Sequence, residues 1–263
     1  MLRIAIVGAS GQMGMRLMDV CASDPEVEVV AALAHPSDPR IGQPAPCGGC
    51  PLILSAETDT AFDALIDFSR PEGTLHWLEH CARAGLAMVS GTTGLTHDQM
   101  TALRVAGRRI PVLWSANFSL GMNLLMRLAP QVALELGRRF NVEIVETHHN
   151  HKVDAPSGTA LELADAVTKA TGGNLERDAV YGRHGQLGPR SKREIGIHAI
   201  RLGDQAGRHE VHFGGPSETV VLTHVVHSRD TFAHGAVRAV KWLSRQQPGW
   251  YTMADVLESA PTR

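Results

Sequence analysis

Three evenly spaced glycines follow the first apolar run of the chain, and this pattern limits the fold more than any other feature. Residues 3–7 are largely apolar and β-branched and stop at Gly8, as a buried parallel strand does. Residues 12–22 then carry apolar side chains at helical spacing. Gly8, Gly11 and Gly14 therefore lie between a strand and a helix, where backbone N–H groups can hold a pyrophosphate. The spacing differs from the commoner Gly-x-Gly-x-x-Gly, so a tight turn without a ligand stays as the alternative.

The first 119 residues alternate between strand-like and helix-like segments. The strand-like runs that follow the first one cover 27–33, 52–54, 64–68, 86–90 and 111–114. Further helix-like segments cover 72–84 and 96–106, and a loop rich in Pro and Gly covers 35–51. Such alternation is typical of a doubly wound parallel sheet, so we expect a Rossmann-type α/β dinucleotide-binding domain over residues 1–119.

The pattern changes after residue 120. A long amphipathic helix at 121–137 precedes a strand at 140–147 and a helix that begins near residue 157. Three strand-like runs then follow without helices between them, at 194–202, 208–213 and 217–226. We therefore expect an α+β substrate-binding and oligomerisation domain with a mixed or antiparallel sheet over residues 120–229. The helical segments at 231–244 and 253–259 are expected to pack back on the first domain, as a third segment over residues 230–263.

Composition and charge exclude several classes of partner. The 263 residues are 43% hydrophobic and carry a formal net charge of −2, so we expect neither nucleic acid nor an anionic membrane as a partner. No apolar run approaches the ~20 residues that span a bilayer. The apolar run at the N-terminus is too short for a signal peptide, and we expect a cytoplasmic protein.

Two of the four cysteines form the segment Cys47-Gly48-Gly49-Cys50, which has the spacing of half a zinc site or of a redox pair. A second pair of ligands is missing, because Cys21 and Cys81 lie singly in helix-like stretches. Prolines flank the segment and place it in a loop rather than at a helix start. We interpret the two cysteines as an incidental surface pair and expect no metal site.

Two further loops and one strand tip complete a predicted cofactor crevice. The segments Gly91-Thr92-Thr93-Gly94 and Ser115-Ala116-Asn117-Phe118 follow predicted parallel strands, at the sheet edge where such folds bind ligands. The second strand ends in Ala34-His35 and lacks the acidic residue that accepts ribose hydroxyls in NAD-specific sites. Either the site accepts the 2′-phosphate of NADPH, with His35 or Arg40 nearby, or it is not strict for one cofactor. The alternative for His35 is that it only begins a solvated loop.

The segment from Glu146 to Ala160 is the most informative part of the chain. It runs from a strand end to a helix start and reads Glu-Thr-His-His-Asn-His-Lys-Val-Asp-Ala-Pro-Ser-Gly-Thr-Ala. The free N–H groups around Ser157, Gly158 and Thr159 form an anion site suited to a carboxylate. Three histidines and a lysine just before it supply positive charge and proton donors. A binding site for an anionic substrate beside an acid catalyst is the simplest interpretation.

Metal binding by the three histidines is the rival interpretation of this segment. A His-His-x-His loop leaving a strand does not readily direct three nitrogens at one ion, and no nearby cysteine or carboxylate pair completes the set. A purely structural role suits one of the three histidines, and His151 is the one for which we expect it.

Together with the glycine loop, this segment resembles the signature of the dihydrodipicolinate reductase family, now called 4-hydroxy-tetrahydrodipicolinate reductase. That signature reads approximately Glu-x-His-His-x-x-Lys-x-Asp-x-Pro-Ser-Gly-Thr-Ala. The resemblance extends over nearly the whole chain, and its other segments are Ile66-Asp67-Phe68-Ser69-Arg70-Pro71, Gly91 to Gly94, Ala116-Asn117-Phe118-Ser119, Ser228-Arg229, Phe232-Ala233 and Gly235-Ala236-Val237-Arg238.

The resemblance implies NAD(P)H-dependent reduction of a cyclic dicarboxylate in lysine and diaminopimelate biosynthesis. His148 would be a proton donor or acceptor and Lys152 a proton donor; which of them delivers the final proton stays open. Substrate contacts would come from His149, Ser157, Gly158, Thr159 and Arg229. Cofactor contacts would come from Gly8, Ala9, Ser10, Gly11, Gln12, Met13, Ala34, His35, Gly91, Thr92, Thr93, Ser115, Ala116, Asn117 and Phe118.

Family members are generally homotetramers joined through the sheets of their substrate domains, so a homotetramer is expected here. Many of them carry an acidic residue followed by Arg where this chain has Ala34-His35, so the choice between NADH and NADPH stays open. Two alternative functions also stay open. One is a related dehydrogenase of aspartate, aspartate semialdehyde or homoserine, and the other is an inactive nucleotide-binding sensor.

Overall fold

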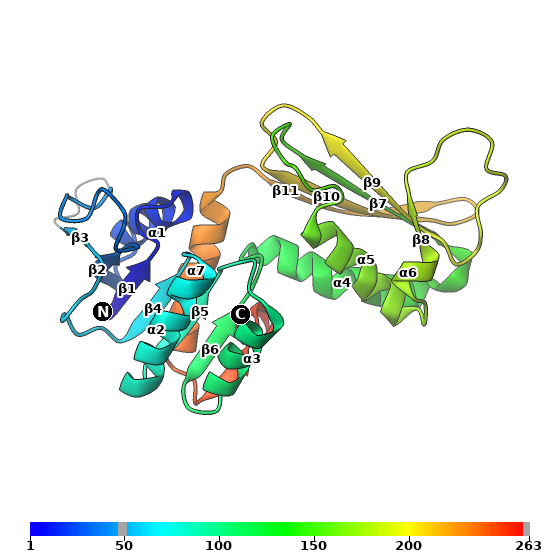
Figure 1. Ribbon diagram of the computed structural model, residues 1–263. Coiled ribbons are helices and arrows are strands. Elements are labelled where there is room, and N and C mark those ends of the chain that lie inside the picture. Colours follow the sequence, from blue (N-terminus) through cyan, green and yellow to red (C-terminus); the bar gives the residue numbers. More distant parts are fainter. Residues whose placement is uncertain (47–51, 260–263) are drawn as a thin grey trace. The chain divides into compact units, whose positions relative to one another are not determined.

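The computed structural model describes residues 1–46 and 52–259 and divides the chain into two compact units (Figure 1). Unit 1 contains Met1–Leu120 and the chain from Arg229 onward, and unit 2 contains Gly121–Ser228. Cys47 and Cys50 lie outside the described residues. No helix among the described residues is both long enough and apolar enough to cross a membrane.

Unit 1 is built on a seven-stranded sheet in the order β12-β6-β5-β4-β1-β2-β3, and all its pairings are parallel. The strand order reverses at β1, as in doubly wound folds, so the predicted Rossmann-type sheet is confirmed. The strands are β1 (Leu2–Val7), β2 (Val27–Leu33), β3 (Leu54–Ser55), β4 (Ala64–Asp67), β5 (Ala87–Ser90), β6 (Pro111–Trp114) and β12 (Gly249–Tyr251).

Helices cover both faces of this sheet (Figure 1). Alternate residues of β1 point to opposite faces, so Ile4 and Ile6 pack on one helical layer and Ala5 and Val7 on the other. The first layer contains α1 (Gln12–Ala22), α7 (Asp230–Leu243) and α8 (Met253–Glu258). The second contains α2 (Pro71–Ala84) and α3 (His97–Ala106). Burial on both faces explains why these strands are apolar runs rather than alternating ones.

Unit 2 is an α+β unit with a five-stranded mixed sheet in the order β11-β10-β7-β9-β8. β10 runs antiparallel to β7 and β11, whereas β7, β8 and β9 are parallel to their neighbours in this group. The strands are β7 (Asn141–His148), β8 (Ala179–Tyr181), β9 (Ile195–Arg201), β10 (Gly207–Gly214) and β11 (Thr219–Val226). The helices are α4 (Leu120–Leu136), the 3-10 turn η1 (Gly137–Arg139), α5 (Gly158–Ala170) and α6 (Leu175–Asp178).

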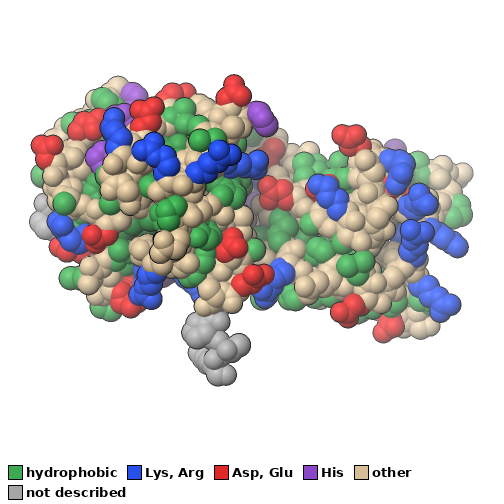
Figure 2. All heavy atoms as spheres, turned by 90° about the horizontal axis from the view of Figure 1, so that it is seen from below, with side chains coloured by type: hydrophobic (Ala, Val, Ile, Leu, Met, Phe, Trp, Pro, Cys, Tyr) green, Lys and Arg blue, Asp and Glu red, His purple; other side chains and the backbone are tan. Residues whose placement is uncertain are grey.

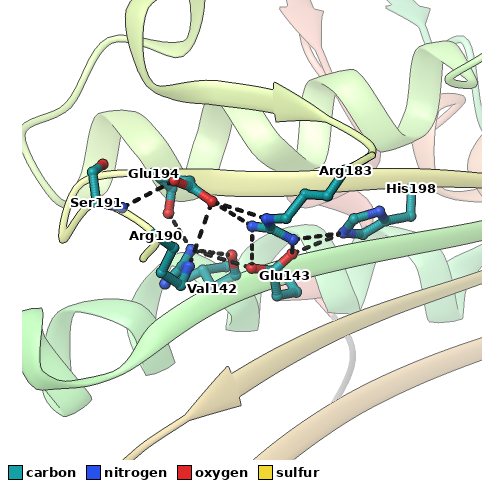
Figure 3. A network of polar contacts seen from close by, with 7 residues as sticks. All are labelled: Val142, Glu143, Arg183, Arg190, Ser191, Glu194 and His198. Carbon is teal, nitrogen blue, oxygen red and sulfur yellow. Dashed lines mark hydrogen bonds and ion pairs between the residues drawn. The ribbon is translucent and has the colours of Figure 1, made fainter. Parts of the chain in front are cut away.

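Within unit 2, the described helices cover one face of the mixed sheet (Figure 1). Val142 and Ile144 of β7 point to that face and share a core with residues of α4 and α5. Glu143 points to the other face, where Arg183 donates to its carboxylate at 2.8 Å and His198 Nε2 lies 2.8 Å away (Figure 3). The two faces of β7 therefore have different chemistry at this point: Val142 and Ile144 are apolar, and Glu143 is charged and paired.

Three short elements, α6, β8 and β12, were not predicted from the sequence. Each contains four residues or fewer, too few to show a helical or strand period. On the face drawn in Figure 2, acidic and basic side chains are mixed over the left-hand part, and several Lys and Arg side chains gather at the right-hand end.

Candidate active site

The glycine loop between β1 and α1 is shaped by backbone that passes too close for side chains. Gly8 has φ of +80°, and a Cβ there would lie 2.3 Å from the carbonyl oxygen of Phe68. A Cβ on Gly14 would lie 2.0 Å from the carbonyl oxygen of Gly8. No side chain caps the N-terminus of α1, so its first N–H groups have no helical acceptor and remain available to an anion.

A cavity of about 740 Å³ lies beside this loop in unit 1. Gly8, Ser10, Gly11, Ala34 and His35 line it, all of which the sequence predicted as cofactor contacts. Of the other predicted contacts, Ala9 and Phe118 bury their side chains in the core of unit 1, and Met13 is partly buried against the same core.

The cavity also contains an ion pair that the sequence did not predict. Asp38 accepts two hydrogen bonds from the Arg40 guanidinium, at 3.0 Å and 2.9 Å, and Arg40 also donates to the Ser10 carbonyl at 2.9 Å. Hydrogen bonds from Arg40 and Ser10 hold the pKa of the Asp38 carboxyl well below its usual value. His35 accepts a hydrogen bond from the backbone N–H of Ser37 at 3.2 Å. An acid and a base therefore both lie close to the tip of β2.

A buried carboxylate ties together the loops at the ends of β4 and β5. Asp67 is fully buried and accepts hydrogen bonds from the hydroxyls of Ser69, Thr74, Ser90 and Thr92, at 2.5 to 2.9 Å. The residues that follow it are thereby fixed against the Gly91 loop. Sequence reasoning gave Asp67 no role, although an acidic residue ending a buried strand was the available signal.

Aromatic packing brings the remaining predicted cofactor loops together. A Cβ on Gly91 would lie 2.4 Å from the ring of Phe68, and the rings of Phe68 and Phe118 lie 5.3 Å apart. Ser115 donates its hydroxyl to the Asn117 carbonyl at 2.8 Å, which closes the loop after β6. Arg229, predicted to contact substrate, lies in unit 1 and donates to Gln12 Oε1 at 2.8 Å.

In unit 2, the predicted catalytic histidine ends β7 and is held by a carboxylate two residues before it. Glu146 is fully buried, and its Oε2 lies 2.6 Å from His148 Nδ1. Arg201 of β9 donates to both oxygens of Glu146, each at 2.9 Å. The backbone N–H of Ser157 donates to Oε1 at 3.0 Å. The carboxylate thus joins two strands to the start of α5.

The N-terminus of α5 faces outward with room for a ligand. Ser157 is the N-cap, and its hydroxyl accepts a hydrogen bond from the Ala160 N–H at 3.1 Å and lies 3.2 Å from His209 Nε2. Gly158 is exposed, and a Cβ there would meet nothing within 4 Å. Thr159 follows it in the first turn. The structure therefore brings His148 together with Ser157, through the carboxylate that both contact.

The loop between β7 and α5 carries the other predicted residues. Lys152 Nζ lies 2.8 Å from Asp154 Oδ1, and Nδ1 of His149 is buried without a hydrogen-bond partner among the described residues. His151 is exposed, so the expectation of a structural role for it is wrong. The buried histidine that supports this site is His209, which is 3% exposed. The described residues contain no group of three or more side chains placed to hold a metal ion.

The charges of the unit 2 site are shifted by burial and by pairing. Burial lowers the pKa of His148, and the nearby charges of Lys152 and Arg201 add to this, against the carboxylate of Glu146, which raises it. Burial raises the pKa of Glu146, but hydrogen bonds from Arg201 and His148 outweigh it and leave that pKa below its usual value. Burial lowers the pKa of His209 to about 4. At neutral pH the site therefore holds an ionised carboxylate and a neutral His209.

Thiol chemistry is not supported at either site by the described residues. Cys21 and Cys81 are both buried in helices of unit 1, and burial raises the pKa of each thiol to about 12. A semialdehyde dehydrogenase of the related group would need a nucleophilic thiolate in its crevice. Neither of these two cysteines meets that requirement.

Two family models together match nearly the whole chain. The family model described as dihydrodipicolinate reductase, N-terminus, matches residues 2–118, and the model described as dihydrodipicolinate reductase, C-terminus, matches residues 121–257. A 4-hydroxy-tetrahydrodipicolinate reductase of Thiobacillus denitrificans is 45% identical, and the match covers 97% of this chain and 98% of that protein. The enzyme of the same name from Pseudomonas fluorescens is 44% identical, with 98% and 99% covered.

A solved structure is similar in fold. It is a dipicolinate-bound dihydrodipicolinate reductase from a Paenisporosarcina species, with a TM-score of 0.77 and 24% identity. The match covers 96% of this chain and 97% of that one. The similarity therefore extends over both units of the fold.

Proposed function

This chain belongs to the dihydrodipicolinate reductase family, and we propose that it reduces 4-hydroxy-tetrahydrodipicolinate to tetrahydrodipicolinate in lysine and diaminopimelate biosynthesis. Loss of water from the ring leaves a double bond conjugated with the ring nitrogen, and the reduction then adds one hydride and one proton to this conjugated system. The observation that carries the proposal is the buried Glu146–His148 pair beside the open N-terminus of α5. This observation supports the proposal, because a proton-transfer group would then lie beside a binding site for a carboxylate.

The substrate has two carboxylates, and the residues at the start of α5 are suited to one of them. Gly158 begins α5, is exposed and leaves space in front of the positive end of the helix, since a Cβ there would meet nothing within 4 Å. His149 offers a buried Nδ1 with no partner among the described residues, as a substrate-binding polar atom would before its ligand arrives. Ser157 and Thr159 complete this end of the helix, and Arg229 is proposed for a second carboxylate.

The proton chemistry is assigned to His148 and Lys152. Bound NADH or NADPH supplies the hydride, and the chain supplies position and charge. The ammonium of Lys152 stabilises the electron density that develops on the ring nitrogen, and Lys152 or protonated His148 delivers the proton there. Lys152 lies on a loop with its side chain 21% exposed, so it can leave Asp154 for a substrate without unfolding a helix or strand.

The glycine loop and its cavity fit a dinucleotide, because side chains are excluded where the phosphates would approach. The pyrophosphate is assigned to Gly8–Met13 and the adenosine to the cavity at Ala34 and His35. The nicotinamide half is assigned to Gly91, Thr92 and Thr93, together with Ser115, Ala116, Asn117 and Phe118.

The Asp38–Arg40 pair suits both cofactors. The Asp38 carboxylate is an acceptor for ribose hydroxyls, in place of the missing acid at the tip of β2. The Arg40 guanidinium is a partner for a 2′-phosphate, and His35 adds a second nitrogen donor nearby. We therefore expect comparable use of NADH and NADPH rather than strict selection of one.

A homotetramer is proposed from the mixed sheet of unit 2. Its face without described helices exposes apolar side chains, including Val221 at 43% and Ile200 at 44%. β11 is an edge strand of eight residues and carries neither Lys nor Pro, the residues that commonly protect such edges. Association of sheets from several chains would cover both features.

A coupled assay tests the proposed reaction. Pyruvate, aspartate semialdehyde and the preceding synthase generate the labile substrate, and the oxidation of NADH and of NADPH is followed separately. Rapid oxidation that depends on the synthase is the expected result, with rates for the two cofactors within about tenfold, a difference of about 1.4 kcal/mol. Folded protein that oxidises neither cofactor would contradict the proposal.

A further inference from the structure

Glu146 is a buried carboxylate whose two oxygens are both fully engaged. Oε2 contacts His148 Nδ1 and one Arg201 nitrogen, and Oε1 contacts the other Arg201 nitrogen and the Ser157 N–H. Burying a carboxylate costs free energy unless donors pair with it as they do here. Apolar side chains of similar size would stabilise the fold equally well. The arrangement therefore calls for a reason beyond holding the strands together.

The donors around Glu146 determine which nitrogen of His148 carries the proton. A guanidinium and a backbone N–H only donate, and an ionised carboxylate only accepts. Glu146 therefore cannot give a proton to His148, and the contact of 2.6 Å requires that Nδ1 be the protonated nitrogen. In the neutral ring, Nε2 is then left as a free acceptor.

The His148 side chain is 12% exposed, and the residue beside its Nε2 is a glycine, which places no side chain there. Gly207 lies on β10, the strand beside β7, and a Cβ there would lie 3.3 Å from Nε2. The ring of His209 lies edge-on, with the two centroids 5.2 Å apart. The charged groups that face His148 are thus Lys152 from the loop, Arg201 from β9 and Glu146 from its own strand, with the neutral His209 from β10.

We propose that Glu146, held in place by Arg201, is a positioning residue that fixes the proton of His148 on Nδ1, so that Nε2 is the atom that exchanges protons with the substrate. The substrate in this inference rests on the proposed function, whereas the position of the proton on the His148 imidazole does not. Arg201 suits the supporting role because a guanidinium stays charged at every pH at which the protein is folded, and so keeps Glu146 ionised.

The same strand provides an internal comparison. Glu143, three residues earlier, also binds an arginine and a histidine, but on the opposite face of the sheet (Figure 3). Its partners Arg183 and His198 contact it on the face of the sheet that points away from Glu146. A carboxylate that only braces the strand is therefore represented by Glu143, and Glu143→Gln serves as the matched control.

The variant Glu146→Gln distinguishes positioning from bracing. The carbonyl oxygen of the introduced side chain is expected at the Oε1 position, where Arg201 and the Ser157 N–H both donate. The opposite orientation would set the NH₂ group against these two donors, whereas at the Oε2 position it meets a single Arg201 donor. In the expected orientation the NH₂ group faces His148 Nδ1 and donates to it. Nδ1 becomes the acceptor, and the proton of the neutral ring moves to Nε2. The tautomer is predicted to invert, which loss of stability alone would not cause.

The tautomer is measured by ¹⁵N NMR of histidine-labelled full-length protein without ligands, with His148→Gln used to assign the signal. Wild-type protein and Glu143→Gln are expected to hold neutral His148 protonated on Nδ1, and Glu146→Gln to hold it protonated on Nε2. A wild-type protein with the proton on Nε2 would overturn the proposal even if Glu146→Gln failed to fold. Retention of the wild-type tautomer in folded Glu146→Gln would overturn it as well.

Kinetics provide a second readout in the coupled assay. For Glu146→Gln we expect kcat to fall by ~10²-fold or more with a smaller change in KM. The limb of the pH profile that belongs to protonated His148 should move to lower pH, because the carboxylate that favours the proton is gone. Thermal shifts with pyridine-2,6-dicarboxylate should persist. An unchanged kcat and pH profile would count against the proposal.

The two proposals fail in different ways. A wild-type protein that shows no synthase-dependent oxidation would contradict the proposed function. The NMR measurement needs no substrate, so it would still test the role of Glu146. Conversely, an active wild-type protein with the proton on Nε2 would leave the reaction intact and remove the role of Glu146.

Discussion

A substitution of Lys152 distinguishes an effect on catalysis from an effect on cofactor binding. It belongs to the unit 2 cluster, and the glycine loop with its cavity belongs to unit 1. In Lys152→Ala we expect kcat to fall by ~10² to 10⁴-fold, the usual contribution of a positioned acid, and the dissociation constant of NADPH to stay unchanged. Lys169→Ala is the control, because Lys169 is exposed on α5 and also pairs with an aspartate. Equal losses in turnover and cofactor affinity would refute the assignment of Lys152.

His209 makes stability depend on pH in a defined window. The unfolded chain takes up a proton near pH 6.5, whereas the folded protein resists it until about pH 4. The stability associated with neutral His209 is therefore present above pH 6.5 and is lost as the pH falls toward 4, by at most roughly 3 kcal/mol. Urea unfolding at about pH 7 and about pH 5 should show a smaller pH dependence for His209→Gln than for wild type.

The control for this measurement is His151→Gln, since His151 is exposed in the same unit. It should retain the wild-type pH dependence. Burial also lowers the pKa of His148 and His224, so some pH dependence will remain in His209→Gln. Identical slopes for wild type and His209→Gln would show that His209 is not held neutral.

Residues adjacent in sequence were within reach of sequence reasoning, and those joined by strand register were not. His148, Lys152 and Ser157 occupy one segment, and their types and spacing indicate an acid beside an anion site. Arg201 meets Glu146 from 55 positions away, and His209 meets Ser157 from 52 positions away. No local pattern encodes these pairings, because they depend on how β9 and β10 align with β7.

At the scale of elements, the N-terminus of α5 allows packing and ligand binding to be tested separately. Gly158 is exposed, is the first residue of the helix and has no atom near the position of a Cβ. In Gly158→Ala we expect equal or higher stability, by up to ~1 kcal/mol from helix propensity, because nothing must move. The new methyl group would occupy the space in front of the helix N-terminus, so the affinity for pyridine-2,6-dicarboxylate should fall by about tenfold or more.

Titration calorimetry and thermal melting on the same samples check both parts of this prediction. Gly214→Ala is the control, since a Cβ there also meets nothing within 4 Å and Gly214 lies at the far end of β10. It should leave the affinity for the dicarboxylate unchanged. Unaltered dicarboxylate affinity in Gly158→Ala would mean that the substrate carboxylate does not bind at this helix end.

The helices and strands could be predicted from the sequence where a segment is long and at least one of its faces is buried. The strands of unit 1 are apolar runs because helices cover both sides of the sheet, and their positions agree with the sequence pattern. β8 and β12 are edge strands of three residues, too short for any period to show. The parallel pairing of β7 with β9 was also beyond reach, because hydrophobic alternation does not report strand direction.

At the scale of the whole molecule, the mixed sheet predicts self-association. On the face of the sheet that no described helix covers, charged side chains lie beside exposed Val221 and Ile200. β11 is an edge strand without the residues that commonly protect such edges. Light scattering after size exclusion should give the mass of four chains of 28.3 kDa each. In Ile200→Lys and Val221→Lys an unpaired charge would be buried at the interface, so the mass should fall to that of smaller assemblies.

Leu134→Lys is the matched control for this measurement. Leu134 is 58% exposed on α4, on the helical side of the same unit, so it tests the addition of a lysine without touching the exposed sheet face. It should leave the mass unchanged, and circular dichroism should show the same secondary structure in all three variants. A monomeric wild-type protein would contradict the tetramer. A tetramer that survives both Ile200→Lys and Val221→Lys would place the contact elsewhere on the molecule, because two lysines could not be accommodated in a packed interface without cost.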